Sequence, residues 1–389
     1  MIRDDKKRKT IFDRIGKRWR EEVDKVKEYE IIEEETEEEK ARREEAERGE
    51  AKKEDIEREE RAEKEFVSFF PSGVGYQEYR EAQRLKEKLL EKYKGKALED
   101  VISGEDFKTE KGMCYHIENQ DKISLEIINP DKARKKILSH LKLIYGIGEV
   151  TEHILKDEGY KTVEDLTGHP RFGSEAARFL EIIEGCDTYQ IIDWMGRWLP
   201  KSHPLVLYSS ALGKKEDFTV LDIETMGLFS RPIILFGVAQ VSGTHILISQ
   251  YFLRSIKEEP AALMGFLSHT NENSIFITFN GRAFDIPYIK ERLAYYRMRA
   301  DLERPHFDVL HFSRRAWREK VPDCRLTTLE KYLLGIKRIN DVPSALVPEF
   351  YETYLKTKNI GPILPIIEHN RQDLVTLASI FSRLHEEWE

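Results

Sequence analysis

Three consecutive runs of apolar and β-branched residues constrain the fold of this chain more than any other feature. The runs read FTVLDI, IILFGVAQV and HILISQYFL and are separated by short turn-like breaks. Such spacing predicts three strands that pair as an antiparallel meander. The chain then alternates: a helix over 260–269, the strand SIFITFN, a helix over 286–297, the strand HFDVL and further helices. A meander followed by strands that are reached through helices predicts an α/β fold with a mixed sheet.

The N-terminal segment has a very different composition. Residues 1–65 contain runs such as EEETEEEKARREEAERGEAKKEDIEREE with hardly an apolar side chain, so they cannot build a core. We expect this charged segment to be helical or disordered, and the sequence leaves open a solvated tether or contact with a protein partner. Its basic start is either a weak phosphate-contacting arm or a tail without a binding role.

Between the charged N-terminal segment and the mixed sheet, the sequence predicts two further units. This fits a chain of 389 residues, which is too long for one ordinary core. Residues 66–130 combine a helical pattern in YQEYREAQRLKEKLLEKY with strand-like segments around GMCYHIE and ISLEII, which predicts a small α+β unit. Residues 131–200 change to helical periodicity, and residues 216–389 contain the mixed sheet.

The helical segment contains a motif with the outline of a helix-hairpin-helix. In LKLIYGIGEVTEHILKDEGYKTVEDLTG an apolar helix is followed by a tight turn at Gly146 and Gly148 and by a second, amphipathic helix. Glycines let such a turn approach a phosphate, and the first amides of the second helix donate to it, so the turn would contact nucleic-acid backbone rather than bases. Because Glu149 and Glu152 beside the turn would repel a phosphate, a helical spacer without a ligand is the alternative.

Cysteine spacing, hydropathy and net charge limit the cellular compartment and the class of protein that the sequence fits. Cys114, Cys186 and Cys324 lie far apart without a CxxC pair, which suggests neither a disulfide framework nor a zinc site and favours a reducing, cytoplasmic setting. The longest apolar stretch, near 232–241, is too short to span a bilayer, so we expect no membrane association. The net charge of -8 argues against a uniformly basic nucleic-acid-binding protein and directs attention to local patches.

Four acidic residues of the mixed-sheet segment are predicted to meet. Asp222 and Glu224 alternate near the end of the first strand, so both side chains point to the same face. Asp285 follows the fourth strand, which lies next to the first in such a sheet, and Asp373 lies in a last helix that can pack across that edge. Four clustered carboxylates call for divalent metal, and oxygen ligands favour Mg²⁺ or Mn²⁺ over zinc. Two such ions about 4 Å apart promote in-line displacement at a phosphodiester.

A histidine accompanies the last of these carboxylates. His369 lies four residues before Asp373, which places both on one face of a helix. A neutral imidazole there is positioned to take a proton from water, so we interpret His369 as the general base, with a structural role as the alternative.

The residues around the carboxylates resemble three motifs of the DnaQ-like, or DEDD, 3'-5' exonuclease superfamily. The motifs are LDIETMGL with Asp222 and Glu224, FNGRAFD with Asp285, and HNRQD with His369 and Asp373. Within that superfamily the chain is most similar to YprB-like ribonuclease-H-like proteins, in which a segment such as DVPSALVPEFYETYL precedes an EHNRxD helix. The resemblance covers about 218–384.

This resemblance implies a ribonuclease-H-like fold and catalysis with two metal ions. The implied ligands are Asp222, Glu224, Asp285 and Asp373, and His369 orients or deprotonates the attacking water. One spacing departs from the family: histidine members usually place the histidine five residues before the aspartate, whereas the four-residue spacing here is that of the tyrosine members. The ligand set is therefore better defined than the role of His369.

Other residues near the motifs have predicted contacts with nucleic acid. Asn280 is expected to cap or position the second motif, Thr225 to help bind a terminal nucleotide, and Phe284 or Leu228 to wedge against a base, with packing as the alternative for each. Asp308 in HFDVL competes for a ligand position, but we expect it to accept a turn hydrogen bond.

A basic strip follows in the sequence and either guides a strand toward the metals or forms a solvated helix face. Its members are Arg314, Arg315, Arg318, Lys320 and Arg325.

The sequence as a whole predicts a metal-dependent 3'-5' exonuclease that acts on a single-stranded 3' end of DNA or RNA. Two alternatives stay open: a non-catalytic nucleic-acid-binding or scaffolding protein on the same fold, and a structure-specific endonuclease. No motif distinguishes DNA from RNA, because that choice depends on contacts with the 2'-hydroxyl.

Overall fold

The computed structural model describes residues 75–123, 125–228 and 230–389. The predicted charged segment 1–65, with its basic start and its predicted protein partner, lies outside the described residues. In the part that is described, no helix is both long and apolar enough to span a membrane. All three cysteines lie in this part, and none of them is paired.

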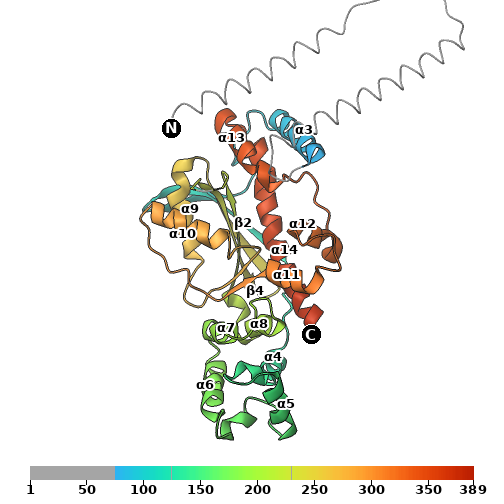
Figure 1. The fold of residues 1–389 in the computed structure, drawn as a ribbon. Coiled ribbons are helices and arrows are strands. Elements are labelled where there is room, and N and C mark those ends of the chain that lie inside the picture. Colours follow the sequence, from blue (N-terminus) through green and yellow to red (C-terminus); the bar gives the residue numbers. More distant parts are fainter. Residues whose placement is uncertain (1–74, 124, 229) are drawn as a thin grey trace, which may run out of the picture. The chain divides into compact units, whose positions relative to one another are not determined.

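The described strands form one seven-stranded sheet in the order β1-β2-β5-β4-β3-β6-β7. Figure 1 shows α9 and α10 on one side of this sheet and α14 on the other. Strands β3, β4 and β5 pair as the antiparallel meander, while β6 and β7 add in parallel beside β3. The predicted mixed sheet is therefore confirmed. The strands are β1 Glu105–Thr109, β2 Gly112–Lys122, β3 Phe218–Thr225, β4 Ile233–Ser242, β5 His245–Phe252, β6 Ile275–Thr278 and β7 His306–Asp308.

Helices account for most of the other described residues. A π-helical turn over Glu330–Leu334 follows α12 directly. The α-helices are α3 Tyr76–Lys92, α4 Pro130–Leu138, α5 Glu149–Asp157, α6 Gly173–Glu184, α7 Thr188–Gly196, α8 Pro204–Tyr208, α9 Glu259–Ser268, α10 Asp285–Tyr295, α11 Val309–Trp317, α12 Leu326–Leu329, α13 Val347–Thr357 and α14 Leu364–Trp388.

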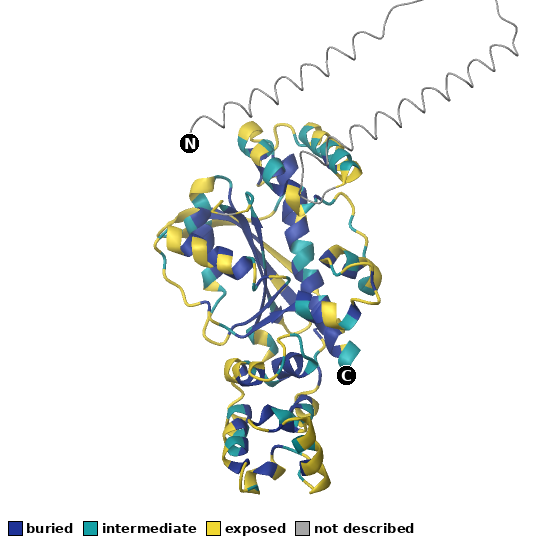
Figure 2. Cartoon of the chain, viewed as in Figure 1, coloured by how far each residue is buried: buried dark blue, intermediate teal, exposed yellow. Residues whose placement is uncertain are grey.

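The central strands read as continuous apolar runs because helices cover both faces of the sheet (Figure 2). On one face Phe236 of β4 stacks on Phe266 of α9, with ring centroids 6.0 Å apart. On the other face Phe218 of β3 packs edge-on against Phe381 of α14 at 5.7 Å. Helix α14 therefore lies across the meander, where its side chains meet those of β3.

The prediction that residues 66–130 form a separate α+β unit is wrong for the strands of this segment. Strand β2 pairs with β5, from Tyr115 opposite Phe252 to Lys122 opposite His245, and β1 pairs with β2. Both strands therefore extend the edge of the C-terminal sheet. A local alternation of residues identifies a strand, but its partner here lies more than a hundred residues away in the chain, and no local pattern encodes that pairing.

The run ISLEII after β2 forms no strand in its described residues, contrary to the prediction. Its side chains Leu125 and Ile128 are buried in the apolar core instead. An apolar run of this length fits a buried connection as well as a strand, so the sequence alone did not distinguish them.

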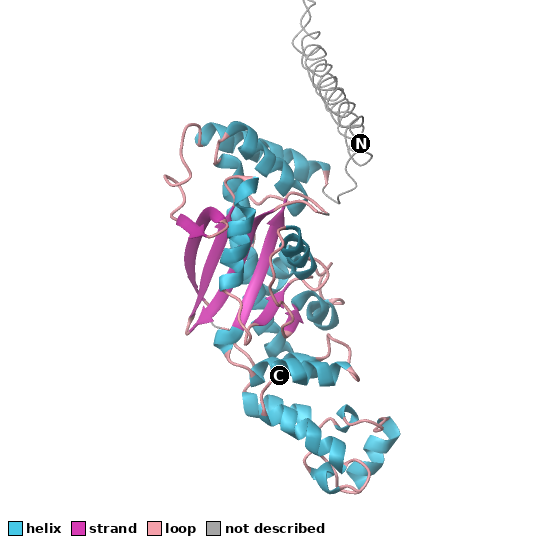
Figure 3. Cartoon of the chain, turned by 90° about the vertical axis from the view of Figure 1, so that its left-hand side faces the viewer, coloured by secondary structure: helices cyan, strands magenta, loops and turns pink. Residues whose placement is uncertain are grey.

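The segment 131–200 is helical, as predicted, and Figure 3 shows its helices gathered beyond one end of the strands. Trp194 of α7 anchors the inside of this segment through an indole hydrogen bond to the carbonyl of Leu143 at 2.9 Å. One buried cluster runs from Trp194 through Leu207 of α8 to Phe218 and Phe381 at the sheet. The helical segment and the sheet thus share a continuous core.

Candidate active site

Strand β3 brings two acidic side chains to one pocket. Asp222 and Glu224 alternate along the strand and both line a pocket of about 680 Å³, which we call the catalytic pocket. The register with β4 shifts between Glu224 and Thr225, so regular pairing ends at the pocket. Apolar neighbours such as Leu221 and Ile223 are buried on the opposite face, which fixes the orientation of the two carboxylates.

Asp285 joins them from the first turn of α10. Because β6 runs parallel to β3, the chain leaves β6 at the same end of the sheet at which β3 delivers its carboxylates. Asp285 Oδ1 accepts a hydrogen bond from the amide of Ile223 at 3.2 Å, the residue between Asp222 and Glu224. The side chain is 4% exposed and lines the catalytic pocket.

Helix α14 is positioned by a buried polar chain that leads to Asp222. Gln250 of β5 donates to Asn370 Oδ1 at 2.8 Å, and Asn370 Nδ2 donates to Asp222 Oδ2 at 2.7 Å. The helix comes this close to β4 because residue 237 is glycine: a Cβ there would lie 2.2 Å from Asn370 Oδ1. The packing of α14 is thereby coupled to the orientation of a candidate ligand.

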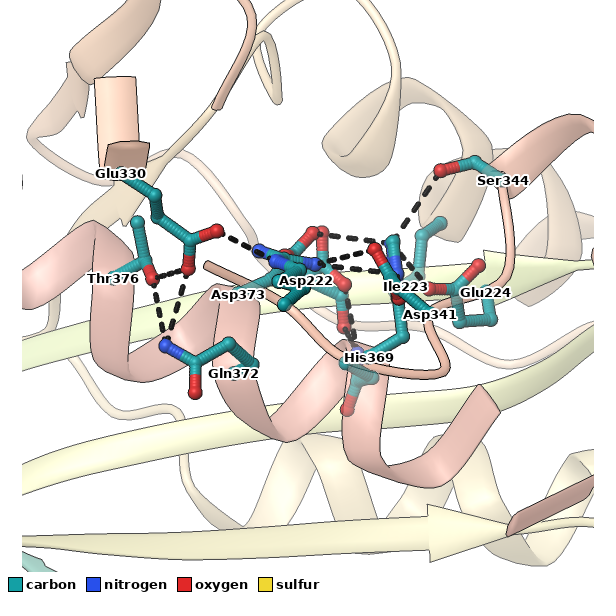
Figure 4. Close-up of polar contacts among 12 residues, drawn as sticks. Asp222, Ile223, Glu224, Glu330, Asp341, Ser344, His369, Gln372, Asp373 and Thr376 are labelled. Carbon is teal, nitrogen blue, oxygen red and sulfur yellow. Dashed lines mark hydrogen bonds and ion pairs between the residues drawn. The ribbon is translucent and has the colours of Figure 1, made fainter. Parts of the chain in front are cut away.

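The same helix places His369 among several acidic groups (Figure 4). Its Nε2 lies 3.6 Å from Asp373 Oδ2 and 3.8 Å from Glu224 Oε1. Its Nδ1 lies 2.6 Å from Asp341 Oδ1, and Ser344 Oγ is 3.4 Å from Nε2. A carboxylate on Nδ1 holds the ring so that Nε2 faces the pocket. Both His369 and Asp373 line the pocket with the three other carboxylates.

Arg338 is the cation that connects this network. Its guanidinium pairs with Asp373, lies 2.6 Å from Glu330 Oε2 through Nε, and lies 3.6 Å from Asp341 Oδ2. Glu330 is 1% exposed and also accepts hydrogen bonds from α14, including one from Gln372 at 3.1 Å. The segment after the π-helical turn is therefore tied to α14 by buried charges.

Burial raises the pKa values of the carboxylates on β3 and α10. It raises the pKa of Glu224 to about 7, and the charge of His369 acts against this rise. It raises the pKa of Asp285 to about 7, although backbone hydrogen bonds lower it. The pKa of Asp222 lies well above its usual range because the charges of Asp373 and Glu224 add to the effect of burial. A site with this unbalanced negative charge binds protons or cations.

For the imidazole of His369 and the carboxylate of Asp341, the pKa shifts favour the charged form instead. Burial disfavours the imidazolium, but the carboxylates of Asp373, Asp341 and Glu224 outweigh it and raise the pKa of His369 to about 10. Burial also disfavours ionisation of Asp341, but its hydrogen bond to His369 and the charge of Arg338 lower its pKa. Without a bound cation, these two groups therefore form a charged pair.

The carboxylates of the catalytic pocket suit a hard divalent cation, although their oxygens do not surround a single point in this structure. Among residues 75–123, 125–228 and 230–389, no group of three or more His, Cys, Asp or Glu side chains forms a ready metal site. Carboxylate oxygens in the pocket have protein partners: Asp373, for example, pairs with Arg338. Four carboxylates nevertheless line one pocket, and such oxygen donors suit Mg²⁺-like ions. The side chains that would hold an ion are Asp222, Glu224, Asp285 and Asp373.

The residues predicted to contact nucleic acid near the motifs also line the catalytic pocket. They are Thr225, Asn280, Phe284 and Leu228, and Leu228 is 66% exposed at the pocket rim. Thr225 Oγ1 donates to the carbonyl of Gly227 at 2.9 Å, so this hydroxyl shapes the turn after β3. Their positions suit contact with a substrate, while the contacts themselves stay predictions.

Asp308 has the structural role that the sequence favoured. It precedes α11, and its carboxylate accepts hydrogen bonds from the amides of Asn280 at 2.8 Å, Arg282 at 3.2 Å and Leu310 at 3.3 Å. It therefore caps α11 and holds the loop of the second motif.

The glycine turn of the helical segment lies away from the catalytic pocket. Gly146 has a φ of +83°, and Gly148 precedes α5 without a side-chain cap on the first amides of that helix. Glu152 is engaged within the segment, because it accepts from the amide of Leu141 at 3.2 Å and pairs with Lys156 at 3.0 Å. The repulsion expected from this glutamate is thus reduced. Neither glycine lines the catalytic pocket.

The predicted basic strip divides into three parts. Arg325 lines the catalytic pocket, and Lys320 pairs with Glu387. The other three members, Arg314, Arg315 and Arg318, line a separate pocket.

Sequence reasoning missed the residues that hold the candidate catalytic groups in place. Asn370 stands between His369 and Asp373 in the third motif, and Asp341 opens the segment DVPSALVPEFYETYL that carries the family resemblance. Their positions within these motifs were the available signal. Arg338 and its partner Glu330 carry no comparable signal, because their pairing depends on a loop that only the structure defines.

Comparison with known proteins agrees with this geometry. Residues 219–385 match the family model of the RNase_H superfamily. The chain is 34% identical over 172 residues to the uncharacterized protein YprB of Bacillus subtilis (strain 168), a match that covers 43% of this chain and 41% of that protein. The chain thus matches less than half the length of this relative.

Proposed function

We propose that this chain is a nuclease, and specifically a 3'-5' exonuclease that hydrolyses the phosphodiester bonds of DNA or RNA. The match of residues 219–385 to the family model of the RNase_H superfamily supports the nuclease. One observation carries the proposal: four carboxylates from β3, α10 and α14 line a single pocket beside a histidine. Carboxylates placed together in this way are the donor set of two-metal phosphodiester hydrolysis. They are Asp222, Glu224, Asp285 and Asp373.

Two Mg²⁺ or Mn²⁺ ions on these carboxylates would supply a hydroxide nucleophile and stabilise the leaving oxygen. His369 presents Nε2 to the pocket and accepts the proton of the attacking water, while Asp341 holds its ring through Nδ1. Cations held by Glu224 and Asp373 would offset the negative charges that raise the pKa of His369, and the imidazole would then be a neutral base. Asn370 keeps Asp222 oriented from the same helix.

The dimensions of the catalytic pocket support action at a strand end. Its volume of about 680 Å³ lies in the range of pockets for small molecules, which favours one splayed terminal nucleotide over a continuous duplex. Its lining includes the apolar side chains of Leu228, Phe284, Ala345 and Pro348, so a base has surfaces against which to stack or wedge. The helix-hairpin-helix turn at Gly146 would contact backbone farther upstream.

The test is cleavage of single-stranded DNA, single-stranded RNA and a duplex with a 3' overhang in Mn²⁺, Mg²⁺ or EDTA. Wild type is compared with Asp222→Asn, Asp285→Asn and the exposed control Asp193→Asn, and a 5' label reports the polarity. A metal-dependent ladder of shortened 5'-labelled products that is lost in the first two variants supports the proposal. A circular strand serves as a further substrate, because only an endonuclease cuts it. Binding to every strand type without hydrolysis would overturn the nuclease and favour the non-catalytic alternative.

A further inference from the structure

A second pocket in the described part of the chain is lined mainly by cations. It has a volume of about 940 Å³ and lies between α11, the segment that follows it and the residues just before α8. Arg314, Arg315 and Arg318 line it together with Lys201. We call this the basic pocket. Its other lining residues are Ser202, His311, Pro322, Asp323 and Cys324.

Most of the cations in the basic pocket lack a counter-ion. Among the residues that the structure describes, Arg314, Arg318 and Lys201 form no salt bridge, whereas Lys320 in the same stretch of chain does. Asp323 is the single carboxylate among the lining residues. Like charges gathered without partners repel one another, so this arrangement favours an external anion.

Two buried histidines that do not line the basic pocket have pKa values lowered in part by the charges of its cations. Burial lowers the pKa of His306 to about 3, and the charge of Lys201 adds to this effect. Burial lowers the pKa of His203 to about 4, with the charge of Arg315 among the further causes. Both imidazoles are therefore neutral and add no positive charge beside the arginines and the lysine of the basic pocket.

The stretch of chain that forms the basic pocket, α11 and the segment after it, reaches the catalytic pocket at both of its ends. At the start, Asp308 caps α11 and holds the amide of Asn280, a residue that lines the catalytic pocket. At the end, Arg325 lines the catalytic pocket, two residues after Asp323 of the basic pocket. Arg318 lies ten residues after Asp308, so α11 places it about 15 Å along the helix axis.

We propose that the basic pocket binds the sugar-phosphate backbone of the same nucleic-acid strand whose 3' end occupies the catalytic pocket. This inference rests on the proposed nuclease function and adds a second contact, a few nucleotides upstream of the bond that is cut. The length of α11 sets the scale of this separation, because about 15 Å corresponds to roughly four nucleotides at the 3.4 Å spacing of a stacked strand.

The composition of the basic pocket selects this ligand class. Guanidinium groups bind phosphate oxygens through paired N–H donors, and three arginines supply several such forks. Its lining residues include no Phe, Tyr or Trp on which a base would stack, so the pocket grips backbone and does not read sequence. It therefore favours longer strands over short ones without a preference among bases.

The experiment compares wild type with Arg314→Gln/Arg318→Gln and with a control that also loses two positive charges, Lys290→Gln/Lys356→Gln. In wild type these lysines pair with Glu303 and Glu352, outside both pockets. Binding of 12-nucleotide oligo(dT) and oligo(rU) is measured in EDTA over a range of salt concentrations. Hydrolysis of dinucleotides and of the 12-nucleotide strands is measured in Mn²⁺.

We expect the arginine variant to bind the 12-nucleotide strand on the order of tenfold more weakly. The slope of log affinity against log salt should fall by about 1.4, because each lost phosphate contact on a single strand contributes about 0.7. Dinucleotide hydrolysis should stay within about twofold of wild type, since a dinucleotide does not reach the basic pocket.

Three results would overturn the inference: unchanged binding of the 12-nucleotide strand, an equal loss in the lysine control, or an equal loss of dinucleotide hydrolysis. Failure of the nuclease proposal gives a different result, namely no hydrolysis of any strand by wild type. In that case the binding comparison in EDTA still decides whether the basic pocket holds nucleic acid.

Discussion

At the scale of single residues, the candidate site depends on how one histidine is held. His369 contacts Asp341 through Nδ1 at 2.6 Å and faces Glu224 and Asp373 through Nε2. A ring held in this way has a defined tautomer once it is neutral. Asp341 is therefore a positioning residue, which acts on the reaction through His369.

Substitution of Asp341 by Asn tests this role. The amide keeps the size of the side chain but removes the negative charge that orients the imidazole, so we expect kcat to fall by about 10- to 100-fold, with little change in strand affinity. The pH dependence of kcat should also shift toward lower pH, because Asp341 raises the pKa of His369. If Asp341 has only a structural role, activity and stability would fall together and the pH profile would keep its position.

Arg338 supports a second prediction at this scale, on stability. The side chain of Glu330 is 1% exposed and that of Arg338 is 10% exposed, so removing the guanidinium leaves a buried carboxylate without its ion-pair partner. Such a loss costs about 3 kcal/mol, and we expect Arg338→Gln to lower the free energy of unfolding by that amount in urea titrations. Adding Glu330→Gln should recover part of it. Arg383→Gln, at an exposed pair with Glu386, is the control and should change stability by less than about 0.5 kcal/mol.

At the scale of elements, the close approach of α14 to the sheet assembles the site. The contact point is Gly237 of β4, where a Cβ would lie 2.2 Å from Asn370 Oδ1 and 2.7 Å from its Nδ2. No other residue type leaves room for the amide that holds Asp222. The geometry of the catalytic pocket is thus set partly by a residue that does not line it.

Gly237→Ala should therefore impair stability and activity together. Overpacking at a buried contact costs about 1 to 3 kcal/mol, and displacement of Asn370 releases Asp222 from its orientation. We expect a lower midpoint in urea and a loss of hydrolysis of at least tenfold. Gly196→Ala is the matched control, because a Cβ there meets nothing within 4 Å. Full activity of the Gly237 variant would show that α14 does not position Asp222.

The elements also differ in how far the sequence alone could predict them. The meander, the two parallel strands and the three motifs follow from local periodicity and from residue spacing, and the structure has these elements in that order. The pairing of β2 with β5 could not be predicted, because the alternation of residues identifies a strand but not the strand with which it pairs. The pairing of Arg338 with Asp373 could not be predicted either, because it depends on where the segment after the π-helical turn lies against α14.

At the scale of the whole molecule, the negative charge of the catalytic pocket affects the stability of the fold. Burial raises the pKa of Glu224 from 4.5 to about 7 and that of Asp285 from 3.8 to about 7. The folded protein therefore holds more protons than the unfolded chain between about pH 4 and pH 7. A raised acid pKa contributes stability that is complete at low pH and is lost as pH rises through the folded value. The raised pKa of His369 acts in the same direction up to about pH 10.

We therefore expect these groups to contribute less to the free energy of unfolding of the metal-free protein as pH rises from about 5 to 8. Asp285→Asn isolates the effect, because the amide does not titrate: its free energy of unfolding relative to wild type should increase across this range, by up to about 1.4 kcal/mol for each unit of pKa shift. The measurement is urea unfolding in EDTA at several pH values. Mn²⁺ replaces the protons as the counter-charge, so it should stabilise wild type more at pH 8 than at pH 6 and have little effect on the variant. A difference between variant and wild type that does not change with pH would mean that Asp285 ionises normally, and the cluster of repelling carboxylates would then not be what draws a cation into the pocket.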